Sequence, residues 1–377
     1  MRKSHQMPTK YICLDDEVEK VKPIVQVLEA AHPDLSIEIR SPYKFDEEVR
    51  QLTKFDYDGL LLDLRLDRAA DADGQRVNYR ALALAQELRT RMTEDGRGRP
   101  MVLWSVDDNF KLSYDKDETS HDLFDKQYYK VNITKDASNI ATEMIDLANG
   151  YKAISATRSK TVKNPYSRLI DLPSAFEILD PRIAQGIADD RAYPAHVFAR
   201  SILRNLIFGN GPLIDERTLA SRLGIDIEKS EDWAKLLDKF AKPAKYTGVF
   251  GTAWPRWWMH KIVEAWSALT DEGGLQRMEA EQRVALSKKL LKLPKLEAAI
   301  PIAEDYDRRY WYVCKFLKAP ISHADAVQLF VDRREWQDGV YASVQAILDR
   351  LHKADGYEIH PFERGRIEDL MQSLKNG

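Results

Sequence analysis

Cysteine and long apolar runs are the scarcest features of this sequence. Its 377 residues include two cysteines, Cys13 and Cys314, each in an apolar context, which excludes a disulfide framework and a cysteine-based zinc site. No apolar run approaches the ~20 residues that cross a bilayer, so we expect no membrane partner. The first residues lead directly into a strand-like segment and lack the apolar core of a signal peptide. These absences favour a reducing, cytoplasmic location.

Repeats and low-complexity tracts are also missing, but the charge and the aromatic residues divide unevenly along the chain. Residues 1–150 carry 22 Lys and Arg against 29 Asp and Glu, whereas residues 151–377 carry 35 against 31. Seven of the eight tryptophans lie in the second part. Hydrophobic residues make up 44% and charged residues 31%, which is typical of a globular protein. Two modules with different chemistry are the simplest account.

The length of the chain also favours more than one domain. We expect a first domain over residues 1–150. Residues 151–168 are basic, polar and poorly patterned, which is typical of a linker. Residues 169–377 form the expected second domain, whose length allows a subdivision near residues 260–300.

Strand-like and helix-like segments alternate over the first domain. Short apolar runs, typical of strands covered on both faces, are separated by segments whose apolar residues recur at helical spacing. The five expected strands cover residues 10–14, 35–40, 57–62, 100–104 and 122–127. The expected helices cover residues 18–32, which Pro23 should kink or restart, 45–55, 78–92 and 133–149. This alternation predicts an α/β, flavodoxin-like, doubly wound fold with a five-stranded parallel sheet.

Polar side chains stand where these strands end. Asp15 and Asp16 follow the first strand, Asp63 the third and Ser105 the fourth, and Lys126 lies on the fifth. Because the carboxyl ends of parallel strands meet at one edge of a sheet, we expect a ligand site there. Three carboxylates in one cleft repel one another unless a cation lies among them, and Mg²⁺ accepts such ligands. A hydroxyl and an ammonium opposite suit a phosphoryl group on the central aspartate.

The sequence resembles the receiver domain of two-component response regulators over about residues 8–150. The resemblance is carried by these five residues, which occur in the same order and each at the end of a strand. The resemblance implies that Asp63 accepts a phosphoryl group from a histidine kinase or a related phosphodonor protein. It also implies that Mg²⁺ is held by three side chains and one backbone carbonyl, those of Asp15, Asp16 and Asp63 and that of Arg65. Taken one at a time, the same residues fit solvated turns and helix N-caps.

The resemblance further implies that Ser105 is a switch hydroxyl and that Lys126 contacts the phosphoryl group. Lys130, four residues later, is a second candidate for the role of the lysine. Residues 107–121, where receivers have a fourth helix, are polar and poorly patterned, so we expect that helix to be short or reshaped. This departure from the receiver pattern removes none of the reactive side chains.

From Leu169 onward almost every segment has a helical pattern. Residues 213–226 resemble the first helix and turn of a helix-turn-helix, with Asp215 as a cap and Gly224 closing the helix. Residues 231–240 would be the second helix. This segment begins acidic, and its apolar stripe suits packing better than a DNA major groove. The pattern therefore favours an ordinary buried pair of helices in a mostly helical domain, with DNA binding as the alternative.

The densest aromatic cluster of the second domain lies at residues 254–260. It contains Trp254, Trp257 and Trp258, with Arg256 among them. These side chains could contact a protein partner or stack on a nucleic-acid base, and they also suit a core. We recognise no catalytic motif in residues 151–377. The sequence therefore predicts a response-regulator-like signalling protein whose helical output domain acts through protein contact or self-association. The alternatives are a DNA-binding transcriptional regulator and an unrecognised effector enzyme.

Overall fold

A computed structural model describes most of the chain. The described residues are 7–68, 77–94, 98–106, 109–110, 114, 120–159, 165–184 and 193–376. Two compact units divide the chain: unit 1 contains Met1–Arg204 and Thr247–Trp254, and unit 2 contains Asn205–Tyr246 and Pro255–Gly377. The backbone therefore passes from one unit to the other at 204/205, 246/247 and 254/255. This division differs from the expected boundary near residue 150.

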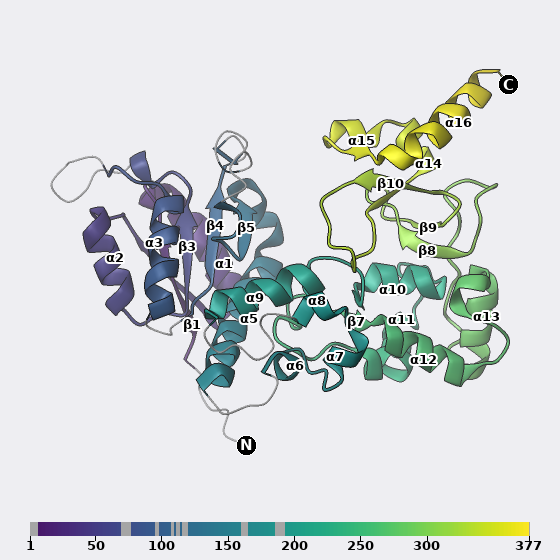
Figure 1. Ribbon diagram of the computed structural model, residues 1–377, viewed down its shortest axis with the longest axis horizontal. Helices are drawn as coiled ribbons and strands as arrows, with labels where there is room; N and C mark the ends of the chain where they lie inside the picture. Colours follow the sequence, from purple (N-terminus) through teal and green to yellow (C-terminus); the bar gives the residue numbers. More distant parts are fainter. Residues whose placement is uncertain are drawn as a thin grey trace. The chain divides into compact units, whose positions relative to one another are not determined.

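A five-stranded parallel sheet forms the centre of unit 1 (Figure 1). Its strands are β1 (Thr9–Leu14), β2 (Leu35–Arg40), β3 (Gly59–Asp63), β4 (Met101–Ser105) and β5 (Lys126–Tyr129). They lie in the order β2-β1-β3-β4-β5, and every neighbouring pair is parallel. This is the flavodoxin-like doubly wound order, so the predicted fold class is confirmed.

Helices cover both faces of this sheet. They are α1 (Val18–Ala31), α2 (Phe45–Lys54), α3 (Ala81–Glu94) and α5 (Lys130–Ser159). Helix α1 packs against α5, and α2 packs against α3 (Figure 1). Helix α1 continues through Pro23 as one element, although we expected a kink or a restart there. The expected fourth helix, at 107–121, lies largely outside the described residues.

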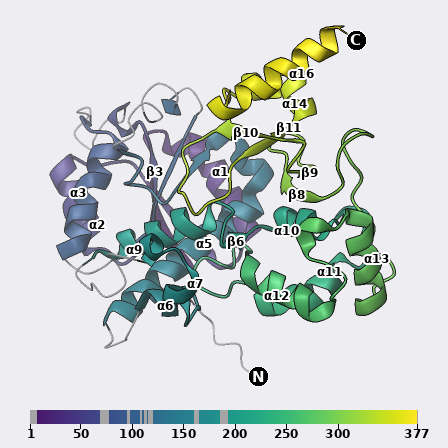
Figure 2. The same cartoon turned by 45° about the vertical axis from the view of Figure 1, so that its right-hand side comes forward.

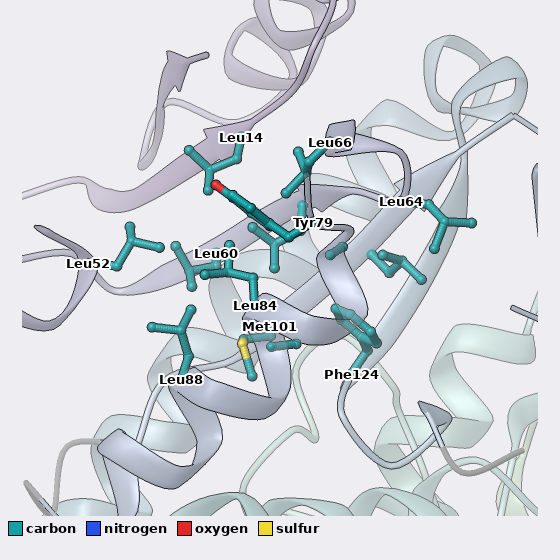
Figure 3. Close-up of a cluster of buried hydrophobic side chains, with 14 of the residues drawn as sticks. Leu14, Leu52, Leu60, Leu64, Leu66, Tyr79, Leu84, Leu88, Met101 and Phe124 are labelled. Atoms are coloured by element: carbon teal, nitrogen blue, oxygen red, sulfur yellow. The ribbon is translucent and has the colours of Figure 1, made fainter. Parts of the chain in front are cut away.

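The face of the sheet under α2 and α3 carries a core of leucine side chains (Figure 3). Leu60 and Leu62 of β3 and Leu84 of α3 are fully buried, and Met101 of β4 packs with them. Each such side chain contributes about 1.5–3 kcal/mol relative to an exposed one. The continuous apolar run of β3 is explained by burial on both faces, which also holds Asp63 at the end of a rigid strand.

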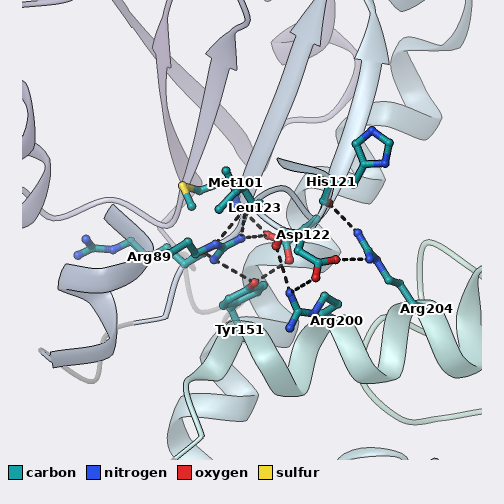
Figure 4. Close-up of polar contacts among 10 residues, drawn as sticks. Arg89, Met101, His121, Asp122, Leu123, Tyr151, Arg200 and Arg204 are labelled. Atoms are coloured by element: carbon teal, nitrogen blue, oxygen red, sulfur yellow. Dashed lines mark hydrogen bonds and ion pairs between the residues drawn. The ribbon is translucent and has the colours of Figure 1, made fainter. Parts of the chain in front are cut away.

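Strand β5 begins at Lys126, four residues later than the expected strand at 122–127. Side chains hold the segment that precedes it (Figure 4), together with a backbone hydrogen bond of 2.9 Å from the Asp125 amide to the Met101 carbonyl. The Asp125 carboxylate accepts a hydrogen bond from the Met101 backbone at 2.9 Å, and Arg89 donates to the Leu123 carbonyl at 2.8 Å. The shift of the strand decides which lysine stands at its carboxyl end.

Helix α5 continues well beyond residue 150, where a linker was expected. Tyr151 and Ile154 are fully buried, and the Tyr151 hydroxyl donates to Asp125 at 2.7 Å. Four further helices of this unit are α6 (Pro165–Leu169), α7 (Ala175–Ile178), α8 (Pro181–Ala184) and α9 (Ala195–Ile202). Because α5 packs against α6 and α9, these helices belong to the same unit as the sheet.

Unit 2 begins with helices, as its apolar pattern predicts. They are α10 (Glu216–Leu223), α11 (Trp233–Leu236), α12 (Met259–Leu269) and α13 (Ala280–Leu291), with β6 (Leu213–Ile214) and β7 (Trp257–Trp258) forming a two-stranded sheet. Asp215 caps α10 by accepting from the Thr218 backbone at 2.8 Å. Gly224 ends α10 at φ 75°, and a Cβ there would lie 2.6 Å from Ala280, so both backbone and space require glycine.

The last part of unit 2 adds short strands that the sequence pattern did not predict. They are β8 (Tyr310–Val313), β9 (Pro320–Ser322), β10 (Ala326–Phe330), β11 (Tyr341–Ser343) and β12 (Glu358–Ile359). Helices α14 (Val344–Leu348), α15 (Leu351–Ala354) and α16 (Arg364–Asn376) follow β11 (Figure 2). Ile347 of α14 and Ile367 of α16 share a core with Val327 and Leu329 of β10.

Candidate functional site

The carboxyl ends of β1 and β3 bring acidic side chains together. Asp15 follows β1 and is fully buried, Asp16 beside it is half-buried, and Asp63 ends β3 with 3% exposure. We call these three residues, with Lys130, the acidic cluster. Its position at the carboxyl edge of a doubly wound sheet is where ligands bind in such folds.

Lys130, the first residue of α5, lies between two of these carboxylates. Its ammonium is 2.7 Å from Asp15 Oδ2 and 2.6 Å from Asp63 Oδ1. Burial alone would lower the pKa of Lys130, but the charges of Asp63 and Asp15 outweigh burial and raise it. The lysine therefore remains charged and is a fixed counter-ion for both carboxylates.

One ammonium does not balance three carboxylates. Burial raises the pKa of Asp15. The charge of Lys130 lowers this pKa and the charge of Asp63 raises it, and the net change is upward. Burial and the charges of Asp63 and Asp15 raise the pKa of Asp16 to about 6. An additional cation beside these carboxyl groups would favour their charged forms.

Backbone groups fix the orientation of the carboxylates. The Arg65 amide donates to Asp63 Oδ2 at 2.7 Å, and the Glu17 amide donates to Asp15 Oδ1 at 3.0 Å. The Arg65 side chain turns instead to Asp67, 2.8 Å away, which holds the turn after β3. Asp63 is therefore held from one side by an amide and from the other by the Lys130 ammonium.

Ser105 and Trp104 complete the neighbourhood from the end of β4. Ser105 is fully buried, and its hydroxyl oxygen accepts a hydrogen bond from Asn109 at 3.2 Å. The Trp104 ring is also fully buried, and its centroid lies 5.0 Å from the Lys130 ammonium. A buried aromatic face stabilises a nearby cation.

Lys126, the lysine expected at the site, lies at the opposite end of β5. Its ammonium is 3.7 Å from the Glu143 carboxylate and 5.5 Å from the centroid of the Trp254 ring. At about 3.3 Å per residue, the four positions to Lys130 correspond to roughly 13 Å along the strand. The structure brings Lys130, the second candidate, to the carboxylates, because the strand begins later than its sequence pattern suggested.

The donor chemistry of the cluster suits Mg²⁺, which prefers carboxylate and carbonyl oxygens. Burial and the charges of Asp63 and Asp15 raise the pKa of Asp16, so a divalent cation among these groups would favour its charged form. Within the described part of the chain, no three acidic, histidine or cysteine side chains converge closely enough to form a ready metal site. The Lys130 ammonium instead lies between Asp15 and Asp63.

The tryptophans for which the sequence allowed either partner contact or a place in the core are buried. Trp254, Trp257 and Trp258 are 8%, 3% and 1% exposed. Trp254 belongs to unit 1, where its indole donates to Glu143 at 3.1 Å. Arg256 donates to the carbonyl of Ile207 at 2.9 Å within unit 2. Each of these side chains is therefore used for packing within its own unit.

The helix pair at 213–240 likewise points inward. Trp233, Leu236 and Phe240, the apolar stripe of the second helix, are 7%, 1% and 6% exposed. The α-helical part of this segment, α11, is one turn long and passes into a π-helical turn at Leu237–Ala241. The stripe is used for packing, as the sequence pattern favoured.

A cavity of about 430 Å³ in unit 2 is lined by two ion pairs and by Lys318. Arg217 lies 3.1 Å from Glu228, and Lys229 lies 3.0 Å from Asp226. Both pairs lie on the wall of this one cavity. Among the helices that the structure describes, none is long and apolar enough to span a bilayer.

No family model and no curated protein matches the sequence. Solved structures similar to the chain include a mutant of RitR, with 12% identity, a TM-score of 0.28 and coverage of 41% of this chain. The chain spans 59% of that RitR chain. FixJ from B. japonicum has 12% identity and a TM-score of 0.25, over 52% of this chain and 89% of its own.

The response regulator RcsB from Salmonella typhimurium is also similar, with 10% identity and a TM-score of 0.23, over 43% of this chain and 82% of its own. Because these TM-scores are low, the fold assignment rests on the strand order of unit 1 itself.

Proposed function

We propose that this chain is a response-regulator-like signalling protein in which Asp63 accepts a phosphoryl group. The observation that carries the proposal is the joint contact of Lys130 with Asp15 and Asp63 at the carboxyl edge of a 2-1-3-4-5 sheet. A carboxylate held between an ammonium and a backbone amide is oriented for nucleophilic attack. The fully buried Ser105 hydroxyl supports the same role as a contact for the transferred group.

The donor in this proposal is a phosphohistidine of a histidine kinase or a related protein. A carboxylate oxygen of Asp63 attacks the phosphorus, a P–O bond forms, and the P–N bond to the histidine breaks. The departing nitrogen takes up a proton, and Asp63 becomes an acyl phosphate. Lys130 offsets the charge that gathers on the phosphoryl oxygens, because its ammonium already lies 2.6 Å from the Asp63 carboxylate.

Asp15, Asp16 and Asp63, with the backbone carbonyl of Arg65, are the residues that would hold Mg²⁺. The ion would supply the positive charge that the cluster lacks and bring carboxylate and phosphoryl oxygens together. Lys130 takes the role that we first expected of Lys126. The transferred group adds up to about two negative charges, which changes what Lys130 and Ser105 contact.

Protein contact is the output that the surface of unit 2 supports. Phe330 and Phe362 are 61% and 92% exposed, and His360 lies between them, with ring centroids 5.9 and 5.0 Å away. Exposed aromatic side chains that gather in this way are typical of protein interfaces. The buried stripe of α11 gives DNA binding no comparable support.

Intact mass after incubation with Mg²⁺ and a small phosphodonor tests the proposal. We expect one phosphoryl adduct on the native chain and none on Asp63→Asn. An adduct on both chains would mean that another residue is the acceptor. No adduct on either chain, under conditions that label an ordinary receiver, and none with a histidine kinase as donor, would overturn the proposal.

A further inference from the structure

A short segment of the second half of the chain belongs to the first unit. Residues Thr247–Trp254, which we call the strap, lie in unit 1, although the residues before and after them lie in unit 2. The Asp146 carboxylate on α5 accepts hydrogen bonds from the backbone of Thr252 at 3.0 Å and of Ala253 at 2.8 Å. The strap is therefore attached to α5 through its backbone.

The centre of the strap fits α5 at a glycine. Phe250 is 1% exposed and has φ 68°, a left-handed conformation that is unfavourable for a side chain of this size. A Cβ at Gly150 of α5 would lie 2.1 Å from the Phe250 ring. Strained backbone of this kind persists only where the surrounding contacts hold it, and it gathers in switch regions.

The end of the strap joins the side chains of β5. The Trp254 indole donates to Glu143 Oε1 at 3.1 Å, and the Tyr128 hydroxyl donates to Glu143 Oε2 at 2.6 Å. The Lys126 ammonium lies 3.7 Å from the same carboxylate and 5.5 Å from the centroid of the Trp254 ring. Glu143 therefore connects α5, β5 and the strap in one group of contacts.

The same strand leads from this group to the acidic cluster. Lys126 and Tyr128 lie on the same face of β5, because they are two residues apart in a strand. Lys130 follows two residues after Tyr128. Tyr128 pairs in register with Trp104 of β4, whose ring centroid lies 5.0 Å from the Lys130 ammonium. A move of Lys130 from the Asp63 carboxylate to a phosphoryl group on that residue would therefore act on the strand whose side chains hold Trp254.

We propose that the strap is a latch through which the state of the acidic cluster reaches unit 2. The inference rests on the proposed function for its trigger, since phosphorylation of Asp63 is what would move β5 and α5. The two ends of the strap continue directly into unit 2, so a shift of the strap is passed on through the backbone. Both ends are anchored in unit 1: Thr247 donates to Asp171, and Trp254 donates to Glu143.

The other passage into unit 2 is also anchored next to β5. Arg204, the last residue of unit 1 before unit 2 begins, pairs with Asp122 and donates to the His121 carbonyl at 2.6 Å (Figure 4). Asp122 lies four residues before β5. Two of the three backbone passages, at Arg204 and at Trp254, are therefore anchored to residues of β5, of the segment before it or of α5, which follows it.

Gly150→Ala is the sharpest test, because it pushes Phe250 away and at the same time favours the helical conformation of α5. Amide hydrogen exchange in the full chain should become roughly tenfold faster at Thr252 and Ala253, because local opening exposes amides. The proposal also requires faster exchange in unit 2, at residues 205–246. Faster exchange in the strap without a change at 205–246 would overturn the latch.

Two tryptophan variants provide a matched comparison. Trp254→Phe removes the indole N–H from Glu143, and Trp266→Phe removes a similarly buried indole N–H that donates to Gly273 at 2.8 Å within unit 2. We expect Trp254→Phe to speed exchange in the strap and at 205–246. The control should leave the strap unchanged. Equal effects of both variants on the strap would contradict a specific latch.

A second measurement separates failure of the latch from failure of the proposed function. Phosphorylated native chain should change its exchange at 205–246, whereas Gly150→Ala should acquire the same adduct mass and lose that change. If neither chain acquires an adduct, the proposed function fails. The coupling is then tested without phosphorylation, by using Lys130→Met to perturb the acidic cluster. Altered exchange of the Thr252 and Ala253 amides in that variant would support the coupling, and unaltered exchange would overturn it.

Discussion

Two groups of buried charges in unit 1 differ in their balance. In the first, Arg89 lies 3.0 Å from Asp125, and the two side chains are 5% and 3% exposed. Tyr151 donates to the same carboxylate, and Arg89 also donates to the Arg99 carbonyl at 3.0 Å. In the second, the acidic cluster, a single ammonium faces three carboxylates, and the pKa values of two of them are raised.

The difference shows how buried charge divides between stability and chemistry. One cation and one anion with several hydrogen bonds form a closed group, and breaking it leaves a buried charge without a partner. Excess like charge makes the folded state less stable and prepares a site for a cation or a reacting group. Arg89 and Asp125 therefore hold the start of β5 in place, while the acidic cluster beside its carboxyl end remains reactive.

The largest expected effect is the loss of the balanced pair. Arg89→Met should lower the free energy of unfolding by about 3–5 kcal/mol, because it leaves the Asp125 carboxylate buried without its cation. Urea denaturation measures this loss. Arg91→Met, on the same helix, breaks an exposed pair with Glu87 and should cost less than about 1 kcal/mol. Similar losses in both variants would contradict the distinction.

The next effect concerns the two lysines of β5 and α5. Lys130→Met should slow formation of the phosphoryl adduct about a hundredfold, because it removes a fixed cation from the reacting carboxylate. Lys126→Met should change the rate of adduct formation by less than about threefold, since its ammonium lies beside Glu143. Intact mass followed over time gives both rates. The reverse order would restore the role that the sequence pattern assigned to Lys126.

Magnesium should stabilise only a complete acidic cluster. At free Mg²⁺ about a hundred times its dissociation constant, the native chain should gain about 2.7 kcal/mol. Asp15→Asn should lose most of this gain, whereas Arg91→Met should retain it. Thermal unfolding with and without the ion checks the expectation, and an equal gain in Asp15→Asn would argue against this carboxylate as a ligand.

The smallest effect is the pH dependence of Asp16 without divalent cations. Its pKa is raised from 3.8 to about 6 in the folded chain, so its stabilising contribution is present below pH ~4 and is lost as the pH rises through about 6. Because Asp16 is half-buried and partly screened, Asp16→Asn should gain only about 1 kcal/mol at pH ~7.5. Urea midpoints should coincide at pH ~3.5, where the carboxyl is protonated in both states. A gain that is independent of pH would have another cause.

Much of unit 1 could be predicted because its signals are local. The apolar run of β3 followed by Asp63 identifies a buried strand and its carboxyl end without any knowledge of its neighbours. The start of β5 could not be predicted in this way, because Asp125 and Leu123 bond to Arg89 and Met101 from elsewhere in the chain. A lysine directly after the aromatic pair that ends β5 was the available signal for Lys130.

In unit 2, the same limit applied to the aromatic residues. The pattern of residues 213–226 predicted the cap at Asp215 and the end of the helix at Gly224, since both depend on backbone conformation within one turn. Burial of Trp257 and Trp258 depends on packing across the unit, which no local pattern contains. The short strands β8 to β12 were missed because few of their residues alternate.

The amino-acid sequence by itself determined a parallel α/β sheet with acidic residues at its carboxyl edge, because apolar runs and the polar residues after them act over a few positions. Only the tertiary structure decided that Lys130 stands at the carboxylates and that Trp254 lies on α5. These contacts join residues 115 and 111 positions apart. They form only when separate elements pack, and the free energy of that packing depends on the whole unit rather than on any one segment.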